Sequence, residues 1–203
     1  PELWQAAGYE VTGRYCSRIL DRAATRDAAA TAQGVSAPAG VDVRPLGREF
    51  AQAYGPIRRM VVERFAVMDE FQPINEGQFD ALIGPLGAVL DRRGTQVAWA
   101  GDDLVGFATM TPDFGRCLDA GGWRARMAVL RHRTRNDAYV ATYMATSRRG
   151  IGQALAARCL AYAAGRGSGT IAGLIHQSAP TNTYFPGAAA NTHHYALFSK
   201  SLA

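Results

Sequence analysis

The sequence predicts a mixed α/β domain, and three observations carry that prediction. Its 203 residues fit one domain, because autonomous cores usually need roughly 100 to 200 residues. Apolar residues make up 48% of the chain and charged residues 19%, near the globular average, which excludes wholesale disorder and a collagen-like repeat. The patterns run from helical periodicity through a strand hairpin to strand, turn, helix and strand, an order typical of helices packed on a sheet.

The first 40 residues are expected to form an appendage and a linker. Residues 1–20 show an apolar start, a turn at Gly8 and then alternating apolar positions, which predicts a short helix followed by a strand. Residues 21–40 are rich in Ala, Thr and Gly and poor in large side chains, a composition typical of linkers. We therefore divide the chain into an appendage at residues 1–40 and a main domain at residues 41–203.

The first half of the main domain predicts a strand and two helices. Residues 41–45 read as a short strand. A helix follows, because apolar residues recur there every three or four positions, as one buried helix face requires. The recurring residues are Phe50, Tyr54, Ile57, Val61 and Phe65. A second helical segment begins at Glu76, and the Gly84-Pro85 pair is expected to kink or restart it, because proline lacks a backbone donor.

The second half predicts a hairpin and a strand, helix and strand unit. The expected strands span residues 95–100, 105–111, 138–144, 171–175 and 195–198. The first two flank Gly101-Asp102-Asp103, which is typical of a tight turn between strands. An arginine-rich insertion at residues 113–137 precedes the third strand. A helix is expected from Ile151 up to the glycine-rich residues 165–169.

A glycine-containing turn joins a predicted strand to this helix. Gly150 and Gly152 let the backbone approach a ligand closely, and the first helical turn leaves N–H groups without intrahelical partners. The helix dipole and the neighbouring Arg148 and Arg149 add positive potential. We interpret residues 147–153 as a cradle for a pyrophosphate group, with a plain strand-to-helix turn as the alternative.

Two better-known cradles are excluded. A Walker loop requires a lysine at its end, and the only lysine in the chain is Lys200. A dinucleotide fingerprint requires Gly or Ala at the position where Leu155 stands. The turn therefore belongs to neither class.

The turn resembles the acetyl-CoA-binding motif of the GCN5-related N-acetyltransferase (GNAT) family, a strand followed by [RQ]-x-x-G-x-G and an amphipathic helix. Here the motif reads Ser147-Arg148-Arg149-Gly150-Ile151-Gly152, so Ser147 replaces the usual Arg or Gln and one phosphate contact is shortened or lost. The predicted order of elements over residues 41–202 also follows that family. Residues 1–20 look like the end of a preceding repeat, so the chain is similar to the C-terminal repeat of a tandem member.

The resemblance implies a GNAT acyl-CoA N-acyltransferase fold, with a central mixed sheet flanked by helices. It implies transfer of an acyl group from acetyl-CoA or another acyl-CoA to the amine of a small molecule, by direct attack and without a metal ion. A backbone N–H near residues 140–142 would polarise the thioester carbonyl. The implied cofactor-binding residues are Val140, Ala141, Thr142, Ser147, Arg148, Arg149, Gly150, Ile151, Gly152, Gln153 and Asn182.

Three side chains are candidates for proton transfer. Tyr184 follows a predicted strand about where the family carries the acid that assists the departing thiolate, with packing under the loop as its alternative role. His176 and Glu70 are alternative bases for the attacking amine. His176 lies at a strand end and has a suitable intrinsic pKa, and Glu70 follows the first helix of the main domain.

Two other functions stay open. Ser147, Ala179 and the missing first repeat would also suit a GNAT-fold binding domain without catalysis. An acyl donor carried on a protein or a tRNA would suit the arginine-rich insertion, whose positive charges include Arg124, Arg126, Arg131 and Arg133.

Composition limits the partners and the location. The net charge of +5 suits an anionic ligand, and nucleic acid is not an expected partner. Cys16, Cys117 and Cys159 are odd in number and far apart, which argues against a disulfide framework and a cysteine zinc site. No signal-like start and no apolar stretch of 18 residues occur, so we expect a cytoplasmic protein without membrane contact. Residues 1–20 are expected to pack on the same domain or, in a homodimer, on a second subunit.

Overall fold

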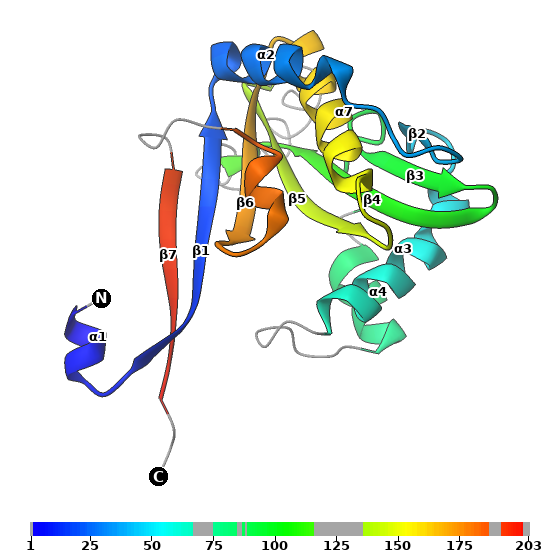
Figure 1. Ribbon diagram of the computed structural model, residues 1–203. Helices are drawn as coiled ribbons and strands as arrows, with labels where there is room; N and C mark the ends of the chain where they lie inside the picture. Colours follow the sequence, from blue (N-terminus) through cyan, green and yellow to red (C-terminus); the bar gives the residue numbers. More distant parts are fainter. Residues whose placement is uncertain are drawn as a thin grey trace, which may run out of the picture.

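The strands form one mixed sheet with helices on both faces (Figure 1). The computed structural model describes residues 2–66, 75–84, 87, 89–115, 136–186 and 192–200. The strands in these ranges are β1 (Glu10–Leu20), β2 (Asp42–Pro45), β3 (Gln96–Ala100), β4 (Asp103–Pro112), β5 (Ala138–Thr146), β6 (Gly169–His176) and β7 (Thr192–Ser199). The helices are α1 (Glu2–Ala6), α2 (Arg22–Thr31), α3 (Phe50–Phe65), α4 (Glu76–Ile83) and α7 (Ile151–Gly165), with short turns η1 (Ala32–Gly34) and η3 (Pro180–Thr183).

The strand order across the sheet is β2-β3-β4-β5-β6-β1-β7. Only β5 and β6 run parallel, and the other described pairs are antiparallel. The predicted hairpin is β3 and β4, and the predicted strand, helix and strand unit is β5, α7 and β6. The predicted mixed α/β fold is therefore confirmed.

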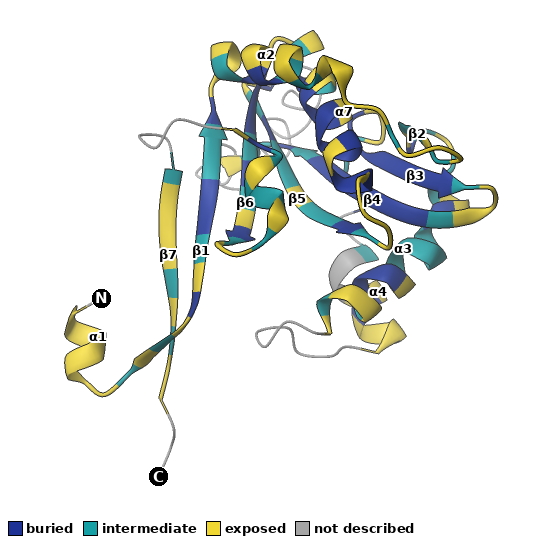
Figure 2. Cartoon of the chain, in the orientation of Figure 1, coloured by how far each residue is buried: buried dark blue, intermediate teal, exposed yellow. Residues whose placement is uncertain are grey.

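The two faces of the sheet are covered by different helices. On one face, Val97 and Phe107 pack in a cluster that includes Val61 of α3. On the other face, their neighbours Ala98 and Ala108 pack in a cluster with α7. This alternation arises because successive strand residues point to opposite faces. Figure 2 shows the result, with β3, β4 and much of α7 buried.

Residues 21–40 contain helix α2, so the expectation of a linker there is wrong. The carboxylate of Asp21 caps the helix by accepting a hydrogen bond from the N–H of Ala24 over 2.8 Å. Ala28 of α2 is buried in a cluster with Ala156 and Leu160 of α7. Small side chains let the two helices pack closely, so the segment needs none of the large apolar residues that a search for periodicity detects.

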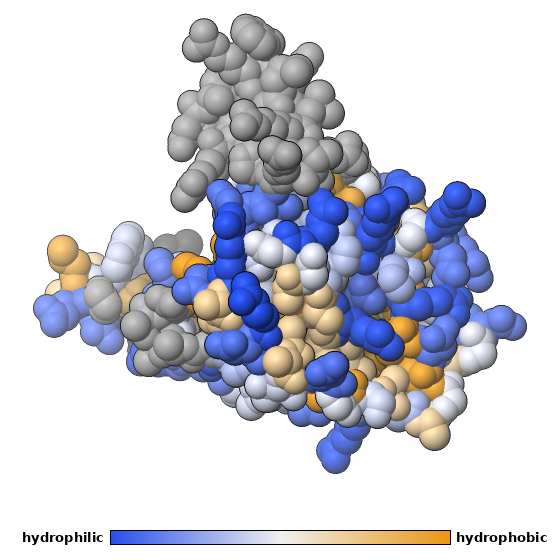
Figure 3. Space-filling view, turned by 90° about the horizontal axis from the view of Figure 1, so that it is seen from above, coloured by the Kyte–Doolittle hydropathy of each residue, from blue (hydrophilic) through white to orange (hydrophobic). Residues whose placement is uncertain are grey.

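The outer side of α2 is polar. Arg22, Arg26 and Asp27 are exposed, and the face seen from above in Figure 3 is largely hydrophilic. Among the residues that the structure describes, no helix has the length and apolar character needed to cross a membrane.

The strand predicted in residues 1–20 is β1, and it lies inside the sheet. It pairs with β6 on one side and with β7 on the other, so that Tyr15 is opposite both His176 and Tyr195. Cys16 of β1 is buried in the same cluster as β6 residues. The N-terminal strand thus packs on the same sheet. The domain boundary near residue 40, and the origin of residues 1–20 in a preceding repeat, stay predictions.

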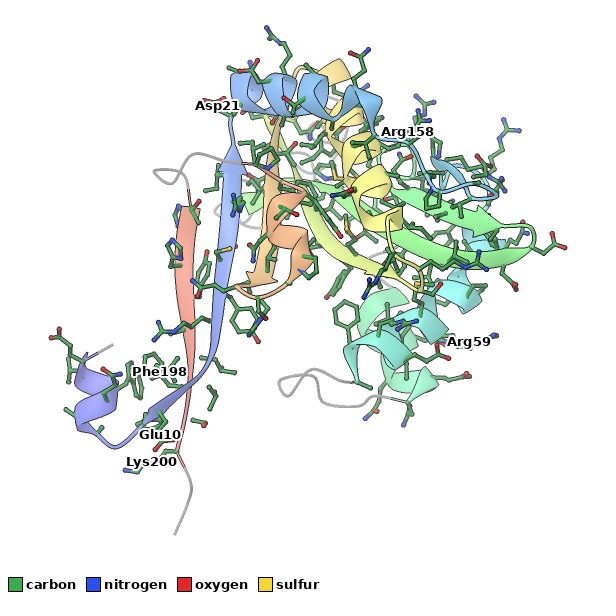
Figure 4. The ribbon with its side chains drawn as sticks, viewed as in Figure 1. Glu10, Asp21, Arg59, Arg158, Phe198 and Lys200 are labelled. Atoms are coloured by element: carbon green, nitrogen blue, oxygen red, sulfur yellow. The ribbon has the colours of Figure 1, made fainter. Side chains whose placement is uncertain are left out.

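The lower parts of β1 and β7 extend beyond the rest of the sheet as a two-stranded ribbon (Figure 1). The end of β6 is marked by the N–H of Gln177, which donates to the carbonyl oxygen of Arg14 over 2.9 Å. Helix α1 packs at the tip of the ribbon, where the rings of Trp4 and Phe198 are stacked with centroids 6.5 Å apart. Figure 4 shows Phe198 and Lys200 at this end, and the ammonium group of Lys200 donates to the carbonyl oxygen of Ala7 over 2.7 Å.

Candidate functional site

The parallel strands β5 and β6 separate along their length. They pair over residues 138–141 and 169–172 and then diverge toward their C-terminal ends, as Figure 1 shows. Gly173 lies at the point of divergence, where a Cβ atom would stand 3.1 Å from the carbonyl oxygen of Ala141. Glycine therefore permits the close approach of the two backbones just before they part.

A cleft of about 220 Å³ occupies the space between the diverging strands. Its walls are β5 residues 141–146, β6 residues 172–176, the end of α3, and three residues of the loop after β6, namely Ala179, Thr181 and Phe185. Arg64 of α3 is the only Arg, Lys, Asp or Glu among the described lining residues. The cleft is therefore free of described carboxylates and carries one positive side chain at its wall, which suits an uncharged or anionic ligand.

A β-bulge distorts β5 where it lines the cleft. Ala108 of β4 is opposite Met144, but Met110 is opposite Ala141, so β5 has one extra residue in this interval. Thr109 fills the gap: its hydroxyl accepts a hydrogen bond from the N–H of Tyr143 over 2.9 Å and donates to the carbonyl oxygen of Tyr143 over 3.2 Å. The bulge bends β5 away from β6, and the threonine satisfies the backbone groups that it exposes.

Helix α7 connects β5 to β6, and its first turn has no side-chain cap. Gly150 is the N-cap residue, and its φ of 83° is a left-handed conformation that favours glycine. Because no described side chain caps α7, the N–H groups of its first turn are available to an anionic ligand. Arg148 and Arg149 are exposed beside them. The turn therefore combines a glycine N-cap with two exposed arginines, and the binding of an anion there stays a prediction.

Ser147 makes an internal contact in this turn. Its N–H and its hydroxyl both donate to the carbonyl oxygen of Val105, over 2.9 and 3.2 Å. The serine therefore ties the turn to β4, which is a structural role that a longer Arg or Gln side chain pointing to a phosphate would not fill.

Two side chains of the chain itself approach the glycines of the turn. A Cβ atom at Gly152 would lie 2.6 Å from Cε2 of Tyr184, so the tyrosine ring uses the space that the glycine leaves. A Cβ atom at Gly150 would lie 3.3 Å from Cγ of Pro38. The lack of side chains at Gly150 and Gly152 therefore lets Pro38 and Tyr184 pack closely against this turn. Because Cα–Cβ bonds of a helix tilt toward its N-terminus, Tyr184 and Pro38 pack at the same end of α7 at which its free N–H groups lie.

Of the three candidates for proton transfer, His176 lines the cleft. Its Nδ1 lies 2.7 Å from the hydroxyl of Ser178, and its ring meets Tyr15 edge to face with centroids 5.2 Å apart. Tyr184 packs against Gly152 and does not line the cleft. The next residue in the sequence, Phe185, does line it. The third candidate, Glu70, lies outside the described residues.

Asn182 holds the loop after β6 in place. Its side-chain amide donates to the carbonyl oxygens of His176 and Gln177, each over 2.8 Å, and its Oδ1 accepts from the thiol of Cys16 over 3.0 Å. Both amide hydrogens are therefore used within the protein. This arrangement favours a structural role over the cofactor contact that we expected from the sequence.

Comparison with known proteins identifies the fold. No protein-family model matches the sequence, and no curated protein matches it significantly. Among solved structures, the GCN5-related glucosamine N-acetyltransferase region of a fungal multi-domain GH3 β-N-acetylglucosaminidase aligns with 96% of this chain, at 10% identity and a TM-score of 0.50. The chain has the GNAT fold.

A second solved structure is similar over almost the whole chain. It is a functionally unknown conserved protein from Staphylococcus epidermidis, which aligns with 97% of this chain at 10% identity and a TM-score of 0.46. This chain spans 63% of that protein and 21% of the fungal one, so it is shorter than two thirds of either. At this level of identity the likeness concerns the fold alone.

In the GNAT fold, the predicted cofactor residues fall into two groups. Ala141 and Thr142 line the cleft, and the turn at residues 147–153 starts α7, whereas Val140 is still paired with Ile171 and does not line the cleft. The arginines of the insertion between Gly115 and Asn136 lie outside the described residues. Within the described ranges, no group of three or more His, Cys, Asp and Glu side chains could hold a metal ion.

The sequence interpretation missed several walls of the cleft. Arg64 and Phe65 come from the end of α3, far from the motif in sequence, and no local signal marks them. Gly173 carried a signal that could have been used, because a glycine inside a strand often marks a close backbone approach. Thr109 gave none, because a bulge depends on how two strands pair.

Proposed function

We propose that the chain is a CoA-dependent N-acyltransferase, which moves an acyl group from an acyl-CoA to the amine of a small molecule. The observation that carries the proposal is the cleft between β5 and β6, which opens in the same β5–α7–β6 unit as the uncapped start of α7. The GNAT fold supports this class of reaction. Acyl-CoA is the co-substrate in this proposal, and its acyl chain is left open.

The turn before α7 would bind the diphosphate of CoA. The N–H groups of Ile151, Gly152 and Gln153 belong to the first turn, where helices bind anions. Arg148 and Arg149 are exposed next to them and can add charge-assisted hydrogen bonds. This arrangement compensates for Ser147, whose hydroxyl is engaged with Val105.

The cleft would hold the thioester, with its carbonyl against the backbone of β5. Ala141 and Thr142 line the cleft at the bulge, where Ala141 makes the last pair with β6 and Thr142 no longer pairs with it. A backbone N–H aimed at the carbonyl oxygen stabilises the charge that develops as the carbon becomes tetrahedral, and removing one such donor typically costs about 10²–10³ in kcat. The amine lone pair then forms the new C–N bond, and the C–S bond breaks.

His176 is the best-placed residue to take the proton from the amine. It lines the cleft, but its Nδ1 accepts a hydrogen bond from the N–H of Ser178 over 3.3 Å, so Nε2 carries the hydrogen of the neutral ring; His176 would accept the proton at Nδ1 after that contact opens. Tyr184 would protonate the departing thiolate only after its ring moves away from Gly152. In this proposal, therefore, both the base and the acid need a local rearrangement before they act.

Ligand-induced stabilisation tests the binding step. We expect CoA to raise the melting temperature of the wild-type chain, since a ligand at 100 times its Kd stabilises a protein by about 2.7 kcal/mol. The double variant Arg148→Glu/Arg149→Glu should lose most of this shift. Arg158→Glu is the matched control, because Arg158 is exposed on the part of α7 remote from the turn (Figure 4). A folded wild-type sample that millimolar CoA does not stabilise would overturn the proposal.

A GNAT-fold domain that binds CoA without catalysis is the second candidate. The observation that favours it is the packing of Tyr184 on Gly152, outside the cleft. Release of free CoA from acetyl-CoA in the presence of a panel of amines separates the two. We expect wild-type turnover that is lost in His176→Ala while the CoA-induced shift is kept. Stabilisation by CoA without turnover on any amine would instead establish the binding domain.

A further inference from the structure

The two edges of the sheet are built differently. The β2 edge is four residues long, contains Asp42, Arg44 and Pro45, and has its arginine paired with Asp42 and Glu49. Short length, charges and proline are the features by which proteins keep an edge strand from pairing with another chain. The β7 edge has eight residues, and none of them is Asp, Glu, Lys, Arg or Pro. The β2 edge is therefore protected against strand addition, whereas β7 lacks these three features and has only α1 packed near its Phe198 end.

Apolar side chains next to the β7 edge are exposed. Tyr195 is 45% exposed and Leu197 is 41% exposed, and both lie on the same face of β7. Leu197 is opposite Gly13, which has no side chain to cover it. Figure 2 shows β7 as the outermost strand with much of its length exposed. Within the described residues, β7 pairs only with β1, so its outer backbone groups face no strand.

A row of aromatic residues crosses the sheet to this edge. His176, Tyr15 and Tyr195 occupy matching positions on β6, β1 and β7, because Tyr15 is opposite both of the others. The row begins at the cleft, which His176 lines, and ends at the exposed ring of Tyr195. Aromatic pairs directly opposite each other on antiparallel strands are stabilising, so the row would gain from a further aromatic residue beyond Tyr195.

We infer that the β7 edge pairs with the β7 edge of a second copy of this chain, in antiparallel orientation, with the two-fold axis at Tyr195. This dimer places the two Tyr195 residues opposite each other and joins the two sheets into one. The aromatic row then continues through Tyr195 and Tyr15 of the second copy to its His176. The inference stands independently of the proposed acyltransferase activity.

The chemistry of β7 favours its own copy over a foreign strand. An edge that selects a charged peptide needs complementary charges along the strand, and β7 has none. Self-pairing centred on Tyr195 sets His193 opposite Leu197 and His194 opposite Ala196, so no like charges meet. Antiparallel pairing of two identical strands also gives closed two-fold symmetry, the commonest form of soluble oligomer.

The oligomeric state in solution tests this inference. Sedimentation velocity of the wild-type chain should show a dimer that dissociates on dilution. Tyr195→Lys should weaken the dimer at least about tenfold, because two like charges then face each other at the axis. Val35→Lys is the matched control, since Val35 is 40% exposed and lies outside the sheet, directly after η1. We expect the control to dimerise like the wild type. A monomeric wild type, or equal dimerisation of both variants, would overturn the inference.

A cross-link tests the position of the axis without relying on the lysine variant. Only residues near a two-fold axis can form a disulfide with their own copy, so Tyr195→Cys should give a covalent dimer on mild oxidation. All variants carry Cys117→Ser, because Cys117 lies outside the described residues; in this background Val35→Cys and the otherwise wild-type chain should not cross-link, since Cys16 and Cys159 are buried. Circular dichroism before oxidation establishes that each variant is folded. Absence of the cross-link in a folded Tyr195→Cys sample would refute the proposed axis.

Discussion

Thr109 and Tyr143 hold the bulge of β5 together through a reciprocal pair of hydrogen bonds. The N–H of Tyr143 donates to Oγ1 of Thr109 over 2.9 Å, and the hydroxyl donates to the carbonyl oxygen of Tyr143 over 3.2 Å. Tyr143 is also a wall of the cleft. A side chain of one strand therefore shapes the part of the next strand that borders the candidate site.

We expect Thr109→Val to destabilise the chain by about 1–3 kcal/mol, because the isosteric change leaves the Tyr143 N–H without its acceptor. Urea unfolding measures the change. Thr12→Val is the control, since Thr12 lies on an exposed strand position and its hydroxyl makes one long contact of 3.4 Å with Leu197. The control should stay within about 0.5 kcal/mol of wild type. Equal stabilities of the two variants would show that the bulge does not need the threonine.

Gly152→Ala should force the ring of Tyr184 to move, because the new Cβ atom would lie 2.6 Å from Cε2 of the ring. Overpacking of this kind typically costs about 1–3 kcal/mol. The cost should fall when Tyr184 is also replaced by alanine, giving a coupling energy of about 1 kcal/mol or more in a double-mutant cycle measured by urea unfolding. Additive effects would mean that the ring and the glycine are not in contact in solution.

Asn182→Ala should destabilise the chain without weakening the response to CoA. The variant loses two donors, to His176 and Gln177, and the acceptor for the Cys16 thiol, with an expected cost of about 1–3 kcal/mol. Melting curves with and without CoA measure both effects, and Thr183→Ala on the same exposed turn is the control. Loss of the CoA-induced shift in Asn182→Ala alone would restore the cofactor contact expected from the sequence.

Alkaline pH should destabilise the chain partly through Cys159. Burial raises the pKa of this thiol to about 12, whereas an unfolded thiol titrates near about 8.5. The folded state therefore holds the proton more tightly, so its contribution is complete below about pH 8.5 and is lost as the pH rises toward 12. Between pH 9 and 11, wild type should lose up to about 1.4 kcal/mol per pH unit more than Cys159→Ala. Urea unfolding at several pH values checks this, and identical slopes for the two proteins would contradict it.

Local patterns predicted the elements that carry a periodicity, a turn or a cap of their own. The periodicity from Phe50 to Phe65 became α3, and the tight turn at Gly101-Asp102-Asp103 became the connection of the β3–β4 hairpin. The second helix begins at Glu76 as expected, and Asn75 caps it in a reciprocal pair with Gln78. Each of these elements carries its signal within its own residues and does not depend on a distant partner.

Helix α2 and the position of β1 had no such signal. Ala28 packs on α7 through its small size, and the helix start at Asp21 is marked only by a cap. Strand β1 was expected, but its place between β6 and β7 depends on pairing with residues 150 or more positions later in the chain. Sequence patterns report which face of an element is buried, and they do not report which partner buries it.

The residues of the candidate site also divide into those that a local pattern predicted and those that depend on contacts with distant segments. The turn before α7 was predicted because glycines, arginines and a helix start are adjacent in sequence. The cleft required four separate segments to meet, and its Arg64 and Phe185 walls could not be assigned from their own surroundings. Asn182 was matched to a family position by its residue type, whereas its hydrogen bonds depend on Cys16, which stands 166 residues earlier.

The pairing of Glu10 with Ser199 joins two strands that are far apart in the sequence, which affects how the chain folds during its synthesis. During synthesis the ribosome delivers β1 first, and neither of its neighbours exists until translation has passed β6 and then β7. Pairing β1 with β6 and β7 closes a long loop of chain. Such pairing is slow, because the chain loses conformational entropy before the contacts between its distant ends are made. Strand β1 therefore has no strand partner until β6 has been translated, and a chaperone that shields residues 10–20 during that interval would raise the yield of folded protein.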